Sequence, residues 1–321
     1  MLSQPTTSEP TVSPRTDTAV RCRGLVKRYA DVTAVNGLDL EVARGECFGL
    51  LGPNGAGKTT TIEILEGLTE PDAGEVEVLG TTWARDGASL RERLGISLQE
   101  TQLTEKLTVG ETVRLFRSFY KRGRDPEAVL SQLSLDEKRD ARVGKLSGGQ
   151  KQRLAVACAL VGDPEVLFLD EPTTGLDPQS RLQLWQIVME FRSHGGTVLL
   201  TTHYMDEAER LCDRVAIVDR GKVIAQGTPP DLISSLHAAN VIEFASEPEI
   251  DEATLRALPG VTEPHRRGPN WSLPVNSLAE TVPVLLDRIE SSGAKLVNLS
   301  THRATLEDLF VSLTGRALRE D

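Results

Sequence analysis

The residues best suited to chemistry form a glycine-rich stretch that ends in Lys58, Thr59 and Thr60. The stretch fits the phosphate-binding pattern G-x-x-x-x-G-K-[ST]. Its residues are Gly52, Pro53, Asn54, Gly55, Ala56, Gly57, Lys58, Thr59 and Thr60. Glycines let the backbone curl so that successive N–H groups point at phosphate oxygens. The Lys58 ammonium can reach the β- and γ-phosphates and the Thr59 hydroxyl can bind Mg²⁺, so the pattern predicts a nucleoside triphosphate site.

Two carboxylates follow an apolar run further along the chain. Asp170 and Glu171 come directly after Val166–Leu169. If this run is a buried strand beside the phosphate-binding loop, Asp170 can hold Mg²⁺ directly or through water. Glu171 is then placed to orient, or take a proton from, a water that attacks the γ-phosphate. Two solvated acids at a strand end are the alternative, which the neighbouring loop motif disfavours.

A third motif, Leu-Ser-Gly-Gly-Gln, precedes the acid pair. Its polar residues are Ser147, Gly148, Gly149 and Gln150, and a helical pattern continues to about Val161. A serine and two glycines at a helix start offer a hydroxyl and free N–H groups, which together can bind an anion. A serine that only caps the helix is the alternative interpretation, and it would be favoured for an isolated S-G-G.

Short apolar runs supply the strands that must position these residues. Nearly unbroken runs of this kind are typical of parallel strands buried on both faces. They are Cys47–Leu51, Val166–Leu169, Val198–Leu200 and Val215–Val218. The pattern of Thr59–Leu65, directly after the loop, is helical. We therefore expect an α/β core that binds its ligand at the carboxyl ends of parallel strands.

The rest of the chain divides into further segments. Val20–Val42 and Glu75–Leu79 predict an antiparallel β-layer, and helical patterns dominate between Glu100 and Leu160, with one helix starting near Thr108. After the Gly-Thr-Pro-Pro cluster at 227–230, strand and helix patterns alternate. The expected elements there are strands at 241–244, 271–275 and 295–299 and helices at 252–257, 277–291 and 305–313. We expect a disordered tail at 1–18, a nucleotide-binding domain at 19–235 and a small α+β domain at 236–321.

Composition narrows the functional classes. The chain has 321 residues, a net charge of −11 and 39% hydrophobic residues. The acidic balance argues against a general nucleic-acid binder and against a polybasic membrane anchor. No apolar run approaches the roughly 18 residues of a membrane span, and no signal peptide is visible. The four cysteines form no C-x-x-C pair and are expected to be buried free thiols.

The order and spacing of these motifs resemble the nucleotide-binding subunit of an ATP-binding cassette (ABC) transporter over about residues 20–228. L-S-G-G-Q is the signature sequence of that family. By this resemblance Tyr29 stacks on adenine, Gln99 touches Mg²⁺ and links the site to a membrane partner, and Asp177 lies in the D-loop. His203 resembles the switch histidine that contacts the γ-phosphate.

The resemblance also implies a fold, an activity and partners. The fold is the P-loop NTPase cassette, with a parallel-sheet core, an antiparallel β-layer and a helical insertion. The activity is ATP hydrolysis with Mg²⁺, in which Thr59, Gln99 and Asp170 surround the metal and Glu171, His203 and Lys58 act on the phosphate. Two copies of the chain would close head to tail around ATP and drive a separate permease, so that the protein sits on the inner face of the cell membrane.

Two further phrases point to a branch of the family. Asp170–Pro178 and Leu306–Phe310 resemble the drug- and antibiotic-exporting ATPases of the daunorubicin-resistance type. Exporters of polysaccharides, lipids or ions, and ABC ATPases outside transport, are the alternatives. A GTPase is disfavoured because its guanine motif N-K-x-D needs an Asn followed by Lys, and no Asn of this chain is followed by Lys.

Overall fold

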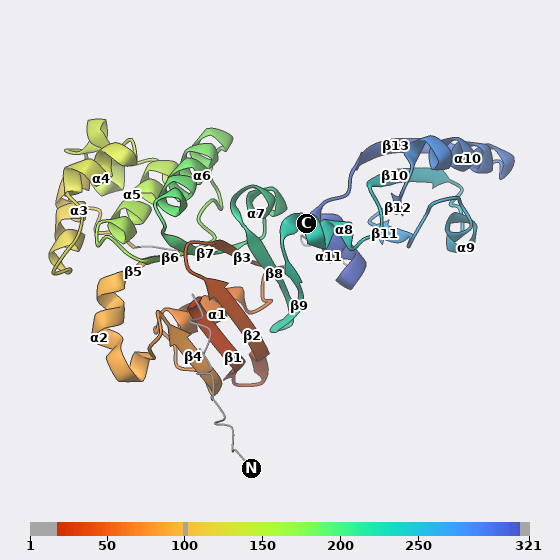
Figure 1. Ribbon diagram of the computed structural model, residues 1–321. Coiled ribbons are helices and arrows are strands. Elements are labelled where there is room, and N and C mark those ends of the chain that lie inside the picture. Colours follow the sequence, from red (N-terminus) through yellow and green to blue (C-terminus); the bar gives the residue numbers. More distant parts are fainter. Residues whose placement is uncertain (1–17, 99–101, 315–321) are drawn as a thin grey trace, which may run out of the picture.

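The computed structural model describes residues 18–98 and 102–314, within which the strands form three separate sheets (Figure 1). One is the central sheet of an α/β core, one is an antiparallel layer below it in Figure 1, and one belongs to the C-terminal part. In the described part of the chain, no helix has the length and apolar character that crossing a bilayer requires. The cysteines at positions 22, 47, 158 and 212 are buried and free, as expected.

The central sheet has the strand order β5-β6-β7-β3-β8-β9. Its strands are β3 (Cys47–Leu51), β5 (Leu94–Ser97), β6 (Val166–Asp170), β7 (Thr197–Thr202), β8 (Arg214–Asp219) and β9 (Lys222–Gly227). The first five pair in parallel and β9 is antiparallel to β8. Strands β3, β6 and β7 are buried along their whole length, which confirms the interpretation of the apolar runs.

The antiparallel layer has the order β2-β1-β4, with β1 (Thr18–Tyr29) between β2 (Val32–Ala43) and β4 (Ala73–Val78). It confirms the expected β-layer. Helix α1 (Lys58–Leu65) lies between this layer and the central sheet (Figure 1). Thr18 already belongs to β1, so the predicted tail at 1–18 is one residue too long because Thr18 pairs with Ala43. The rest of that predicted tail lies outside the described residues.

Helices cover the opposite face of the central sheet. They are α3 (Val109–Ser118), α4 (Pro126–Gln132), α5 (Gly148–Leu160), α6 (Pro178–Ser193) and α7 (Met205–Leu211), with short turns η1 (Asp136–Lys138) and η2 (Val143–Lys145). Alternate residues of β6 serve the two faces: Leu167 and Leu169 pack with these helices, and Val166 and Phe168 pack with α1. Helix α2 (Trp83–Arg93) lies at the edge of the layer and was not predicted.

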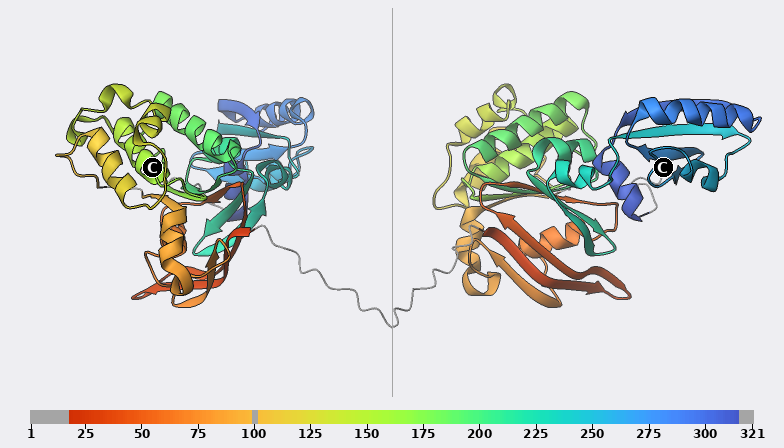
Figure 2. Two further views of the ribbon diagram at one scale, coloured as in Figure 1. Left: turned by 60° about the vertical axis from the view of Figure 1, so that its left-hand side comes forward. Right: turned by 45° about the vertical axis from the view of Figure 1, so that its right-hand side comes forward.

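The C-terminal part contains a third sheet, ordered β11-β12-β10-β13 (Figure 2). Its elements are α8 (Pro229–Ser234), β10 (Asn240–Glu247), α9 (Glu252–Arg256), β11 (His265–Arg267), β12 (Asn270–Val275), α10 (Leu278–Ser291), β13 (Lys295–Arg303) and α11 (Leu306–Thr314). Helix α11 leaves this sheet and packs against α8 and α7, where Leu309 and Phe310 join the core that contains Leu211. Helix α11 belongs by sequence to the predicted C-terminal domain but packs against the nucleotide-binding part. The boundary near residue 235 therefore stays a prediction.

Candidate functional site

The predicted phosphate-binding loop connects β3 to α1 and is held tightly by its neighbours. Gly57 has φ +99°, and a Cβ placed on it would lie 2.2 Å from the Ala34 carbonyl oxygen. A Cβ on Gly52 would lie 2.2 Å from the Val218 carbonyl oxygen. Only glycine fits these positions, so no side chain at either of them covers the backbone N–H groups of the loop. Within the described residues no side chain caps the start of α1, and its first N–H groups can donate to an anion.

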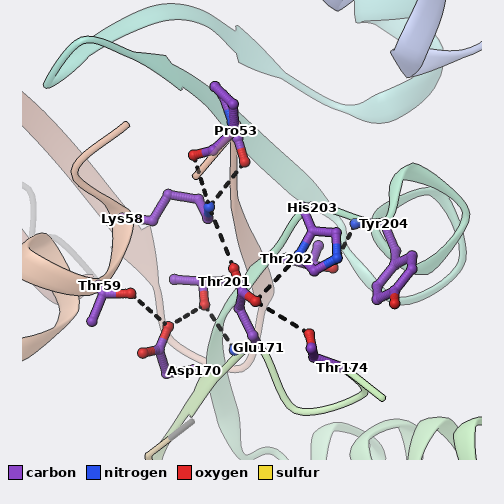
Figure 3. Close-up of polar contacts among 11 residues, drawn as sticks. Pro53, Lys58, Thr59, Asp170, Glu171, Thr174, Thr201, Thr202, His203 and Tyr204 are labelled. Atoms are coloured by element: carbon purple, nitrogen blue, oxygen red, sulfur yellow. Dashed lines mark hydrogen bonds and ion pairs between the residues drawn. The ribbon is translucent and has the colours of Figure 1, made fainter. Parts of the chain in front are cut away.

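Lys58 is buried at the start of α1 and turns back over the loop (Figure 3). Its ammonium Nζ donates to the carbonyl oxygens of Gly52 at 2.9 Å and Pro53 at 3.2 Å. It also lies 3.5 Å from Glu171 Oε1. Burial lowers the pKa of Lys58, and the negative charges of Glu171 and Asp170 oppose that shift. The loop lysine and the predicted catalytic acid therefore form one buried ion pair.

Glu171 follows β6 and is held by its backbone conformation and by several side-chain contacts. Its backbone has φ +45°, which costs a non-glycine residue about 1–3 kcal/mol. Its Oε2 lies 3.2 Å from His203 Nδ1 and accepts the Thr174 hydroxyl at 3.2 Å. The contact with His203, helped by the Lys58 charge, lowers the pKa of Glu171 to about 2 against the opposing effect of burial. The carboxylate is therefore ionised at neutral pH and can only accept hydrogen bonds.

Asp170 ends β6 beside the helix that carries Thr59. Its Oδ1 accepts the Thr59 hydroxyl at 3.4 Å and the Thr201 hydroxyl (Figure 3). Thr201 also accepts the backbone N–H of Glu171 at 2.9 Å, so it links the two acids. Carboxylate and hydroxyl oxygens are ligands that suit Mg²⁺, and this donor set fits such an ion. Gln99, the third predicted ligand, lies outside the described residues.

Sequence reasoning missed Thr201. Its position follows from the parallel pairing of β6 with β7, where Asp170 and Thr201 are register partners. The signal that could have found it is a polar residue directly after the apolar run Val198–Leu200, at the sheet edge where ligands bind.

Tyr29 lies at the end of β1 and keeps 46% of its surface exposed. Its register partner is Val32, two residues before Ala34, whose carbonyl touches the phosphate-binding loop. Lys27 Nζ lies 5.4 Å from the centre of the Tyr29 ring. The ring is therefore exposed, as adenine stacking would require, and it lies on the hairpin whose second strand contacts the loop.

The signature motif begins α5. Ser147 accepts the backbone N–H of Gln150 at 3.3 Å, and Gln150 Oε1 accepts the backbone N–H of Ser147 at 3.0 Å. This reciprocal cap leaves Ser147 and Gly148 exposed. Among the described residues, no hydrogen bond or ion pair joins Ser147–Gln150 to Gly52–Thr60. The structure thus brings together the loop, both acids and His203, while the signature motif stands apart from them.

Asp177 is the N-cap of α6. Its carboxylate accepts the Ser180 hydroxyl at 2.6 Å and the backbone N–H groups of Ser180 at 3.0 Å and Gln179 at 3.1 Å. The Ser180 hydroxyl, followed by these backbone N–H groups, lowers the pKa of Asp177. In this chain the predicted D-loop residue thus fixes the start of a helix.

Glu66, at the end of α1, is a buried acid on the same side of the sheet as Asp170. In the described part of the chain neither of its carboxylate oxygens has a hydrogen-bond partner, and only 2% of the residue is exposed. Burial, with the charges of Asp170 and Glu63, raises the pKa of Glu66 from 4.5 to about 8. The folded protein thus holds a proton that the unfolded chain releases between these values, and its stability falls as pH rises through that window.

We expect Glu66→Gln to relieve this penalty in a pH-dependent way. The gain in unfolding free energy should be about 3 kcal/mol larger at pH 9 than at pH 5.5, because each pKa unit corresponds to about 1.4 kcal/mol. Urea unfolding without nucleotide or Mg²⁺ measures it. Glu70→Gln is the control, since Glu70 is exposed and lies four residues further along the chain. An equal effect of Glu66→Gln at both pH values would contradict the assignment.

Comparison with known proteins places this site in a family. The sequence profile of the family described as ABC transporter matches residues 35–174. The Nod factor export ATP-binding protein I of Ralstonia nicotianae is 41% identical over 305 residues, which cover 92% of this chain and 94% of that protein. The protein of the same name from Rhizobium meliloti is 40% identical over 308 residues, covering 94% of this chain and 90% of that protein.

Solved structures give the same result for the fold. A structure of the ATP binding subunit of an ABC transporter aligns with a TM-score of 0.63 and 30% identity, over 68% of this chain and 94% of that one. A dimeric bacterial ABC transporter cassette aligns with a TM-score of 0.60 and 27% identity, over 65% of this chain and 98% of that one. The cassette fold expected from the sequence is confirmed. The chain therefore belongs to the ABC transporter family as an ATP-binding subunit, and it binds and hydrolyses ATP.

Proposed function

We propose that this chain is the ATPase of an exporter whose membrane-spanning permease is a separate polypeptide. The observation that carries the proposal is the similarity to proteins named for Nod factor export, which extends over 92–94% of this chain and so includes the C-terminal part. A cassette from Clostridium perfringens that is part of the ABC transporter complex cbiONQ aligns with a TM-score of 0.61 and 30% identity, over 68% of this chain and 92% of that one. That relative supports a partner in the membrane. The chain would then sit on the cytoplasmic face through its permease.

The cargo we propose is a drug or antibiotic, as the daunorubicin-resistance-type phrases suggest. The names of the relatives favour a second candidate, a compound of the Nod factor kind. Both candidates require the same direction of transport. We also propose that residues 19–235 act as the catalytic unit and that residues 236–321 support dimerisation or regulation.

We further propose that two copies close around two ATP molecules, as the dimeric bacterial cassette relative suggests. Tyr29 would stack on adenine, the loop Gly52–Thr60 would hold the phosphates, and Ser147–Gln150 of the other copy would cap the γ-phosphate. The exposed start of α5, unconnected to its own loop, supports an intermolecular role.

The buried ion pair gives the site a way to respond to ATP. Lys58 balances the charge of Glu171 at 3.5 Å, and a γ-phosphate would compete for the same ammonium. When Lys58 turns to the phosphate, Glu171 keeps His203 but loses a cation, so it becomes more basic. We propose that Glu171 then orients the attacking water, that His203 contacts the γ-phosphate, and that Thr59, Asp170 and Gln99 surround Mg²⁺, which neutralises phosphate charge when bound.

The exporter proposal is tested in the cells that make the protein. An affinity-tagged chain purified from detergent-solubilised membranes should carry a multi-span membrane protein with it. Deletion of the gene should raise the intracellular level of the exported compound, measured across a panel of antibiotics and compounds of the Nod factor kind. The wild-type gene should restore export, and a Glu171→Gln gene should not. Unchanged efflux of the whole panel, with no membrane protein recovered, would contradict the proposal.

A further inference from the structure

Three contacts join α6, which follows Asp177, to α7, which follows His203. Trp185 Nε1 donates to Glu207 Oε1 at 2.9 Å. The Arg181 guanidinium lies 4.4 Å from the centre of the Tyr204 ring. Arg181 also pairs with Asp206 at 3.4 Å. These contacts are made side by side along two packed helices, so each limits the movement of the other helix.

These contacts complete a closed path through the catalytic residues. His203 lies 3.2 Å from Glu171, and its ring centre lies 4.2 Å from that of Tyr204. Along the chain, Glu171 leads through Asp177 into α6, and His203 leads into α7. Helices α6 and α7 pack against each other, which closes the path (Figure 1). These contacts form a continuous physical connection from α6 to the imidazole that faces Glu171.

Glu207 is the buried centre of this path. It has no exposed surface, and its Oε1 accepts the Trp185 indole from α6. Burial raises the pKa of Glu207. Glu207 lies on α7, four residues after His203. A buried carboxylate is costly without a hydrogen-bond partner, so packing alone does not explain an acid here.

We propose that Glu207 is a positioning residue that ties α7, the helix that follows His203, to α6 and so holds the imidazole against Glu171. The indole of Trp185 is its partner on α6. The proposal rests on the catalytic roles proposed for Glu171 and His203. If closure of a second copy moves the Asp177 end of α6, His203 should move with it.

The test is a double-mutant cycle on the purified full chain, read by single-turnover release of radiolabelled phosphate from ATP. Glu207→Leu should lower the rate constant about 30-fold, since small misplacements of catalytic groups cost up to about 100-fold. ATP affinity, measured with a fluorescent analogue, should change less than about twofold, because only placement of the imidazole is lost. Glu207→Gln, which keeps an acceptor for Trp185, should recover most of the rate.

The decisive comparison uses His203→Ala. If Glu207 acts through His203, Glu207→Leu should have almost no further effect in that background, because the group it positions is gone. Glu209→Gln is the matched control on α7: its carboxylate accepts the Leu306 N–H at 3.0 Å instead of contacting α6, and the rate should stay at the wild-type value.

Two outcomes would overturn the inference while leaving the catalytic roles intact. One is a wild-type rate for Glu207→Leu while His203→Ala is slow. The other is an equal fold loss from Glu207→Leu with and without His203, which indicates a general structural role. If Glu207→Leu does not fold, Trp185→Phe removes the donor and keeps an aromatic ring, and the same two outcomes apply. A wild-type rate for His203→Ala would instead overturn the proposed role of that histidine, and this inference with it.

Discussion

Glu171→Gln is expected to lower steady-state ATP turnover by about three orders of magnitude, within the range found when a general base is removed. Gln has the same shape but cannot accept a proton, and it has no charge to align a polarised water. The substitution also removes the partner of Lys58 at 3.5 Å and of His203 at 3.2 Å. ATP binding should be kept, because the loop N–H groups and Lys58 remain and the lysine is freed for phosphate.

Phosphate release and equilibrium nucleotide binding, measured on the same preparation, separate these two effects. Glu165→Gln is the matched control. Glu165 precedes the same strand β6 at its other end, where it pairs with Arg93 and Arg44. Its substitution should change turnover less than about twofold, since a surface ion pair contributes about 1 kcal/mol or less to stability. Glu171→Gln protein that hydrolyses ATP near the wild-type rate would refute the role of Glu171.

Ser147→Arg is expected to lower ATPase activity about 100-fold while one isolated chain still binds ATP. If the exposed start of α5 closes over the phosphate held by a second copy, an arginine there overfills a close contact, which costs up to about 3 kcal/mol. Light scattering with ATP and the Glu171→Gln background, which holds ATP unhydrolysed, should then show that the dimer is lost.

The substitution also removes the cap that Ser147 provides to Gln150, worth about 1 kcal/mol. Ser147→Ala loses the same cap without adding bulk, so a comparison of the two at equal thermal stability isolates the steric effect. Ser147→Thr keeps the cap and the hydroxyl and should stay close to wild type. Full activity of Ser147→Arg, in a strictly monomeric protein, would argue against a site built from two copies.

The sequence predicts those parts of the fold whose signals are local. Runs such as Val166–Leu169 identify buried strands because both faces of each strand meet apolar cores. The loop Gly52–Thr60 is predicted because its chemistry depends on adjacent residues. Strand β9 gives a weaker signal, since it alternates exposed and half-buried residues at the sheet edge. Helix α2 is interrupted at Asp86, where the backbone leaves helical geometry.

Contacts between distant segments were harder to predict. The hydroxyl bridge of Thr201 depends on the register between β6 and β7. The bond from Trp185 to Glu207 joins two helices that a strand separates in the chain. The return of α11 to α7 depends on how the C-terminal sheet is oriented. In each case the sequence gives the residue type, but only the packing of the folded chain determines which residue it contacts.

The position of α11 bears on how the protein is made. During synthesis the residues of α7 leave the ribosome well before Leu306, Leu309 and Phe310, which complete the same hydrophobic cluster. Domains generally fold as they emerge from the ribosome. The part of the chain before α11 therefore exposes an apolar surface until α11 has been synthesised and packs on it. A stop codon near residue 235 would leave that surface permanently open, so such a shortened product should need chaperones or aggregate.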